Sequence, residues 1–110
     1  MTEMDLIDTV ELKEKLDRGD DFKLVMTLGE WEYRTSHIPG SLRISTVEEA
    51  FGGLRHHEEI ILYDSGPPCN ASRMASRMLK ARGYTRVRRY AGGLQEWESA
   101  GHPLEGEHLA

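Results

Sequence analysis

The chain has 110 residues, 38% of them hydrophobic, and a formal net charge of -5. This size fits one domain with one modest core, and the composition is too apolar for a disordered chain. Acidic and basic residues are interleaved, so no basic stripe suggests nucleic-acid binding. No apolar run approaches the ~20 residues that span a bilayer. The single cysteine, Cys69, excludes an internal disulfide, and no signal peptide is recognised, so we expect a cytoplasmic protein.

The first half of the chain alternates between helix and strand signals. Asp8 and Glu11 form a capping-box-like pair, and Gly19 ends the helix that they begin. Thr46 and Glu49 form a second such pair, ahead of the apolar residues of another predicted helix. Between them the sequence predicts, in order, a strand at 22–26, a helical turn at 31–33, a tight turn at 37–40 and a strand at 42–44.

The second half begins with the strongest strand signal, Ile60–Tyr63. It is continuously apolar, as expected for a strand that is covered on both faces. A loop rich in turn formers follows, and Asn70 is a favourable N-cap for the next helix, which Gly83 ends. Apolar residues recur in that helix at the required spacing: Ala71, Met74, Ala75, Met78 and Leu79. A strand at 87–90 and a helix opened by Gly92-Gly93 complete the chain.

Strands separated by helices predict an α/β domain with a mostly parallel sheet covered on both sides. We expect one domain over residues 1–110 with a core of about 8–104, and a loosely ordered tail at 105–110. Ligand sites in such sheets form beyond the carboxyl ends of the strands. The loop Asp64–Ser72 lies at such an end, so it is the expected seat of any chemistry.

A loop that leads into a helix N-terminus collects free N–H groups and partial positive charge. It therefore suits an anion, such as an oxyanion, a phosphate or a thiolate. Cys69 beside the N-cap is equally consistent with a reactive thiol and with a small packed side chain. Asp64 fits a nucleophile, a base or a metal ligand, but a structural role in binding loop N–H groups is favoured. A cysteine phosphatase needs an arginine at the position of Ala75, so that chemistry is not expected.

Other chemically suggestive residues have simpler interpretations. Trp31 and Trp97 are predicted to be core residues rather than substrate-stacking ones. His56 and His57 are interpreted as solvated, and no spacing indicates a metal site with Cys69. The cluster Arg86, Arg88 and Arg89 is interpreted as a solvated strand edge rather than a phosphate-binding patch.

A set of motifs, each weak alone, occurs in a specific order over nearly the whole chain. They are Glu32-Tyr33, His37–Ser41, Ile60–Tyr63, Gly83-Tyr84, Tyr90–Gly93, Trp97 and Gly101–Leu104. Together they resemble the rhodanese-like (sulfurtransferase) family. The resemblance implies a three-layer α/β fold with about five mostly parallel strands flanked by helices. It also implies a loop in which a cysteine directly after the central strand takes sulfur from a donor such as thiosulfate, holds it as a persulfide and passes it on without a cofactor.

The chain departs from the family pattern in that loop. Family loops of the form Tyr-Cys-x-Gly-Pro-x-Cys-x-x-Ser are similar to Tyr63–Ser72, but the first cysteine is replaced by Asp64. Cys69 matches the second, non-catalytic cysteine. The Asp-x-Arg that is usual near the first strand is replaced by Met26-Thr27-Leu28. A carboxylate cannot form a persulfide, and Asp64 is expected to accept the loop N–H bonds itself and to disfavour thiosulfate.

The sequence therefore predicts a degenerate rhodanese-like domain that acts as a binding or regulatory module. Two alternatives stay open, namely an active sulfurtransferase with a persulfide on Cys69 and a redox sensor based on the same thiol. The expected partner is a small sulfur-containing anion, a thiol or a protein, with no metal, cofactor, nucleic acid or membrane. The oligomeric state is left open. The expected binding loop comprises Asp64, Ser65, Gly66, Pro67, Pro68, Cys69, Asn70 and Ser72.

Overall fold

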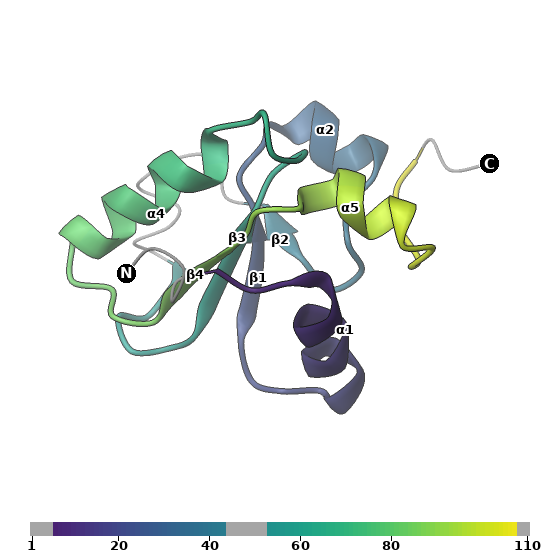
Figure 1. Ribbon diagram of the computed structural model, residues 1–110. Helices are drawn as coiled ribbons and strands as arrows, with labels where there is room; N and C mark the ends of the chain where they lie inside the picture. The colour runs from purple at the N-terminus through teal and green to yellow at the C-terminus, as the bar shows by residue number, and fades with distance from the viewer. Residues whose placement is uncertain (1–5, 44–52, 108–110) are drawn as a thin grey trace.

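The computed structural model describes residues 6–43 and 53–107. Its centre is a parallel sheet in the order β2-β1-β3-β4 (Figure 1). The strands are β1 (Lys23–Met26), β2 (Leu42–Arg43), β3 (Ile60–Tyr63) and β4 (Val87–Tyr90). The helices are α1 (Thr9–Arg18), α2 (Glu30–Thr35), α4 (Ala71–Ala81) and α5 (Gly93–Ser99). The predicted α/β architecture is confirmed.

The sheet has four strands among the described residues, one fewer than expected. Beyond β4 the pairing is limited to an isolated parallel bridge between Leu6 and Arg89. The N–H of Ile7 donates to the carbonyl of Arg89 at 2.9 Å. The chain then turns into α1 at Thr9, so among the described residues this edge of the sheet gains only that one bridge.

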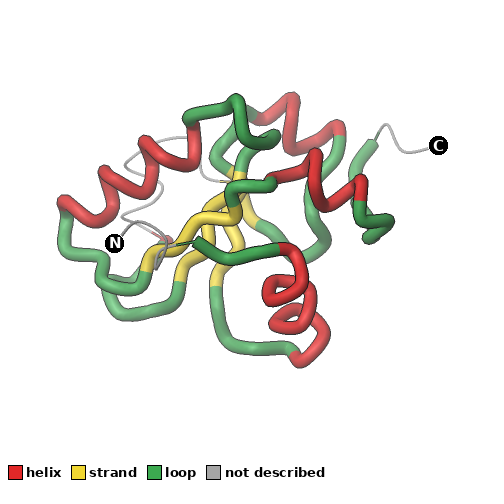
Figure 2. Tube along the Cα trace, viewed as in Figure 1, coloured by secondary structure: helices red, strands yellow, loops and turns green. Residues whose placement is uncertain are grey.

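Helices cover both faces of the sheet, with α1 and α5 on one side and α4 on the other (Figures 1 and 2). Strand β3 is buried at all four positions. Because side chains alternate along a strand, Ile61 and Tyr63 join the core under α1 and α5, whereas Ile60 and Leu62 join the core under α4. The unbroken apolar run of this strand thus reflects its central place between two cores.

The predicted cap of α1 is confirmed. An Asp8 side-chain oxygen accepts a hydrogen bond from the N–H of Glu11 at 2.8 Å, and Gly19 ends the helix in the left-handed conformation. Residues Thr46 and Glu49 of the second predicted capping box lie outside the described residues, as do Ile44, Ala50 and Phe51.

The two tryptophans differ in burial. Trp97 is a core residue, as predicted, and its indole N–H donates to the carbonyl of Pro103 at 2.8 Å. The prediction for Trp31 was wrong, because this side chain is 67% exposed. Tyr33 is the residue of short α2 that packs against the core. Residues two apart do not share a helix face, so Trp31 points away from that core.

The segment after α5 is also more ordered than the sequence indicated. Glu105 pairs with His37 in an antiparallel bridge, with N–H to O distances of 2.7 and 2.9 Å. The N–H of Glu107 donates to the carbonyl of Arg34 at 2.7 Å. Residues up to Glu107 are therefore bonded to α2 and to the turn that follows it.

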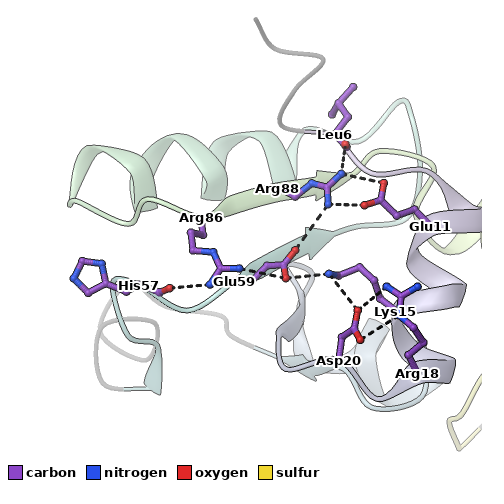
Figure 3. Close-up of polar contacts among 9 residues, drawn as sticks. All are labelled: Leu6, Glu11, Lys15, Arg18, Asp20, His57, Glu59, Arg86 and Arg88. Atoms are coloured by element: carbon purple, nitrogen blue, oxygen red, sulfur yellow. Dashed lines mark hydrogen bonds and ion pairs between the residues drawn. The ribbon is translucent and has the colours of Figure 1, made fainter.

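The cluster Arg86, Arg88 and Arg89 was expected to be a solvated strand edge. That expectation was wrong for Arg88 and Arg89, the two arginines of β4. Arg88 binds the Glu11 carboxylate at 2.9 Å and the carbonyl of Leu6 at 2.9 Å. Its guanidinium also lies 3.8 Å from Glu59, within a network of charges shown in Figure 3. Arg89 donates a hydrogen bond to the side chain of Ser72 in α4. Only Arg86 is exposed.

Candidate functional site

The loop that follows β3 lies at the carboxyl end of the sheet, between the start of α4 and the start of α5 (Figure 1). Its first residues are held from two sides. The backbone N–H and the hydroxyl of Thr27, just after β1, both donate to the carbonyl of Tyr63, at 2.9 and 3.1 Å. The N–H of Leu94 donates to the carbonyl of Asp64 at 3.0 Å. The loop therefore starts from a fixed position.

Asp64 is buried, with 1% of its surface exposed. One carboxylate oxygen accepts a hydrogen bond from the N–H of Gly66 at 3.2 Å, and the other accepts one from the N–H of Ser72 at 2.9 Å. Ser72 is in the first turn of α4, whose N–H groups have no partners within the helix. Asp64 thus binds loop N–H groups itself, as its position in the sequence indicated.

Asn70 occupies the N-cap position of α4, but its side chain makes no capping hydrogen bond. The carboxylate of Asp64 supplies that acceptor from six residues earlier in the chain. The expectation that the Asn70 side chain caps the helix was therefore wrong. A remote, charged acceptor replaces the local, neutral one, and a negative charge suits the positive end of the helix dipole.

Close backbone packing between the loop and α5 explains the second glycine of the Gly92-Gly93 pair. Gly93 has φ +64, and a Cβ there would overlap the carbonyl oxygen of Asp64. The N–H of Gln95 donates to the carbonyl of Ser65 at 2.9 Å. Only glycine allows α5 to begin against the loop in this way, so the motif serves to fix the loop.

Cys69 lies in the same loop as Asp64. Its side chain is partly exposed, and its N–H donates to the carbonyl of Gly66 at 3.0 Å. Ser65, Pro67 and Pro68 are exposed. The loop thus has a buried, polar inner side centred on Asp64 and an outer side that carries the only thiol of the chain.

Arg89 contributes to the site, although the sequence did not single it out for this role. Its Nε donates to the hydroxyl of Ser72 at 3.2 Å, and Ser72 is fully buried. Val87 lies in the core under α4, and residues two apart in a strand share a face. This alternation is the signal that could have placed Arg89 beneath the start of α4.

Tyr63, the last residue of β3, connects the loop to the turn at 37–41. Its hydroxyl accepts a hydrogen bond from the N–H of Ile38 at 3.0 Å and lies 2.8 Å from the hydroxyl of Ser41. Burial raises the pKa of Tyr63 to about 12. His37 stacks on Tyr33 with ring centroids 3.9 Å apart.

A separate cavity of about 360 Å³ is lined by residues at the start of α1, at the end of β4 and at the start of α5. Asp8, Glu11 and Glu96 contribute to its lining, so its charge does not suit an anion. Within residues 6–43 and 53–107, no three His, Cys, Asp or Glu side chains are grouped so as to hold a metal ion. In the same ranges, no helix is long and apolar enough to cross a membrane.

Comparisons with known proteins agree with this architecture. The profile of the rhodanese-like domain matches residues 8–100. A putative sulfur carrier protein of Bacillus subtilis, YrkF, is 31% identical over 88 residues, which are 77% of this chain and 46% of that protein. The chain therefore spans about half the length of this curated relative.

Solved structures are similar over most of the chain. The BH2092 protein of Bacillus halodurans is 25% identical with a TM-score of 0.89, over 98% of this chain and 82% of that one. The rhodanese-like domain of the Alr3790 protein of Anabaena is 26% identical with a TM-score of 0.85, over 94% and 80%. The human single-domain sulfurtransferase TSTD1, at 20% identity and a TM-score of 0.73 over 86% and 96%, shares the fold. The chain belongs to the rhodanese-like domain family.

Proposed function

We propose that this chain is a rhodanese-like module in which Asp64 stands in place of the sulfur-carrying cysteine, and that it binds or regulates without transferring sulfur. The observation that carries the proposal is the buried carboxylate of Asp64, which accepts N–H bonds from Gly66 and Ser72. An aspartate has no sulfur nucleophile. Its negative charge also repels a second anion, such as thiosulfate, from the same N–H groups.

The proposed partner is a molecule that carries sulfur, either a small anion, a thiol or a protein. The similarity to a putative sulfur carrier protein supports this choice. A cytoplasmic location is part of the proposal, because one free cysteine suits a reducing compartment. No metal or organic cofactor is required for such a role.

The partly exposed thiol of Cys69 supports a second candidate function. Its thiolate would attack the outer sulfur of thiosulfate, the S–S bond would break, and sulfite would leave, so that Cys69 holds a persulfide. An acceptor thiolate or cyanide would then attack that sulfur and free the thiolate of Cys69. In a redox sensor, peroxide would instead oxidise the same thiol to a sulfenic acid.

A thiosulfate–cyanide assay of the wild type and three variants tests these functions together. We expect no thiocyanate from the wild type or from Asp64→Ser, and turnover from Asp64→Cys. Serine matches cysteine in size but provides no sulfur, so it controls for opening the loop. If Asp64→Cys is folded and inactive, the loss of the nucleophile does not explain the missing activity.

Cys69→Ser separates the alternatives. Turnover by the wild type that disappears in Cys69→Ser would contradict the proposed function and establish Cys69 as the nucleophile. Mass spectrometry after thiosulfate treatment should find no added sulfur on the wild type. A sulfur added to Cys69 would support the second candidate, and a peroxide-dependent intermolecular disulfide on a non-reducing gel would support the redox sensor.

A further inference from the structure

One face of α4 carries four solvent-exposed residues on two neighbouring turns of the helix. Met74 is 61% and Met78 is 45% exposed, and Arg73 and Arg77 are exposed beside them. Pairs separated by four residues lie one above the other on a helix, so these residues form two adjacent rows. The opposite side of α4 is buried on the sheet through Ser72, Ser76 and Leu79. The four exposed residues are named the Met–Arg face below.

The charge of this face differs from that of the rest of the molecule. The chain has a net charge of -5, yet Ala71–Ala81 contains no acidic residue. Arg73 and Arg77 form no ion pair or side-chain hydrogen bond among the residues that the structure describes. Most other described cations do form ion pairs: Lys13, Lys15, Arg18, Lys23, Arg34, Arg86 and Arg88. The Met–Arg face is therefore a positive, partly apolar patch on an acidic chain.

We propose that the Met–Arg face docks a segment of a partner protein that is acidic and carries apolar side chains. Arginine binds carboxylates through paired hydrogen bonds, and methionine adapts its shape to irregular apolar surfaces. Charge complementarity thus determines that the partner segment is negatively charged, and the two methionines indicate that it also carries apolar side chains. This inference rests on the proposed binding role and names the kind of partner that the role requires.

Other polyanions fit this face less well. Duplex DNA is held by many phosphate contacts, whereas two free arginines offer few, and the net charge of -5 repels a polyanion at a distance. An interfacial membrane helix needs a broad apolar face with residues such as Trp, Phe or Leu. On α4 the large apolar residues in solvent are the two methionines.

The position of the Met–Arg face connects it to the candidate site. Arg73 directly follows Ser72, whose N–H binds the carboxylate of Asp64. The face therefore starts at the end of the loop and extends along the next two turns of α4. A partner segment that docks here has its end beside the loop, where a carried sulfur group would meet the domain.

Selection from a displayed random-peptide library tests the proposal without a known partner. We expect the peptides that bind the wild-type domain to be rich in Asp, Glu and apolar residues. Fluorescence anisotropy should show about tenfold or greater loss of affinity for Arg73→Glu/Arg77→Glu, because like charges then face each other. Met74→Ala/Met78→Ala should weaken binding as well, since it removes apolar contact area.

A matched double variant controls for overall charge. Lys13→Glu/Arg18→Glu changes the net charge by the same amount but lies on α1, on the opposite face of the sheet, and should keep the wild-type affinity. Selected peptides without acidic residues, or equal losses in both double variants, would overturn the proposal. The proposal would also be overturned if duplex DNA or phosphatidylserine vesicles bound the Met–Arg face more tightly than the selected peptides do.

Self-association is the remaining outcome to separate. Sedimentation that shows a dimer of the wild type, lost in Arg73→Glu/Arg77→Glu, would assign the face to a second copy of the chain and overturn the proposal. The experiment is independent of the sulfur-transfer assay, which reads the loop alone. Turnover by the wild type would reject the proposed function and leave the peptide result unchanged, and the reverse also holds.

Discussion

Strand β3 has a nearly buried carboxylate at each end, and the two are stabilised in different ways. Asp64 follows the strand and accepts hydrogen bonds from the backbone N–H groups of Gly66 and Ser72. Glu59 precedes the strand, is 13% exposed, and lies 3.0 Å from the ammonium of Lys15 (Figure 3). Arg86 and Arg88 approach the same carboxylate at 3.8 Å.

The difference lies in what the donors can do when the carboxylate is removed. Lys15 has a second carboxylate, Asp20, at 3.7 Å, and Arg88 has Glu11 at 2.9 Å. These side chains can therefore keep a partner or turn toward water. The N–H groups of Gly66 and Ser72 belong to the backbone of buried residues, so they have no such choice. A carboxylate bound by backbone defines the shape of its loop, whereas one bound by side chains is exchangeable.

The largest effect is expected for Asp64→Ala. This change removes the acceptor of two N–H groups and the cap of α4, which should lower the free energy of unfolding by about 2–4 kcal/mol. Urea denaturation measures the difference. Asp64→Asn keeps one carbonyl acceptor and should lose less. A loss below about 0.5 kcal/mol for Asp64→Ala would contradict the comparison, since such small values are typical of surface substitutions.

Tyr63 extends the comparison to an uncharged polar group of the same strand. Its pKa is raised from 10.0 to about 12, so the unfolded chain releases this proton at a lower pH than the folded one. The contribution to stability is therefore complete below pH 10 and falls as the pH rises toward 12, by up to about 2–3 kcal/mol. Denaturation of the wild type and of Tyr63→Phe across this range measures the slope.

Tyr63→Phe should reduce the dependence of stability on pH but not remove it. Burial also raises the pKa of Tyr90, which therefore keeps a smaller dependence in place. Tyr63→Phe lowers stability at neutral pH as well, by removing the acceptor of the Ile38 N–H. The comparison therefore rests on the change with pH. If the stability of the wild type and of Tyr63→Phe changed equally with pH, the assignment of the pH dependence to Tyr63 would be contradicted.

The smallest effect is expected at the other end of β3. Glu59→Leu should cost about 1–2 kcal/mol, less than a fully buried ion pair, because both side chains keep some contact with water. Adding Lys15→Met should restore stability to within about 1 kcal/mol of the wild type, since an apolar pair replaces the ion pair. Denaturant midpoints of the single and double variants decide this. A double variant less stable than Glu59→Leu alone would show that Lys15 has other essential contacts.

Local patterns predicted the features that depend on neighbouring residues. The cap of α1 by Asp8, the continuous burial of Ile60–Tyr63 and the left-handed turn after α4 at Gly83 all follow from short-range rules. The predictions that failed depend on residues far apart in the sequence. Trp31 points to solvent because Tyr33 makes the core contact of α2, and periodicity in so short a helix did not indicate which of the two would be buried.

The site shows the same division. The sequence by itself determined where the loop lies and which groups it offers, because Asp64 directly follows a buried strand and the loop leads into a helix. Only the tertiary structure decided which donors Asp64 binds, that Asn70 does not cap α4, and that Arg89 reaches Ser72. The physical reason is that hydrogen bonds within one turn follow from local backbone geometry. Those between β3, β4 and the start of α4 depend on how the sheet and helix pack together.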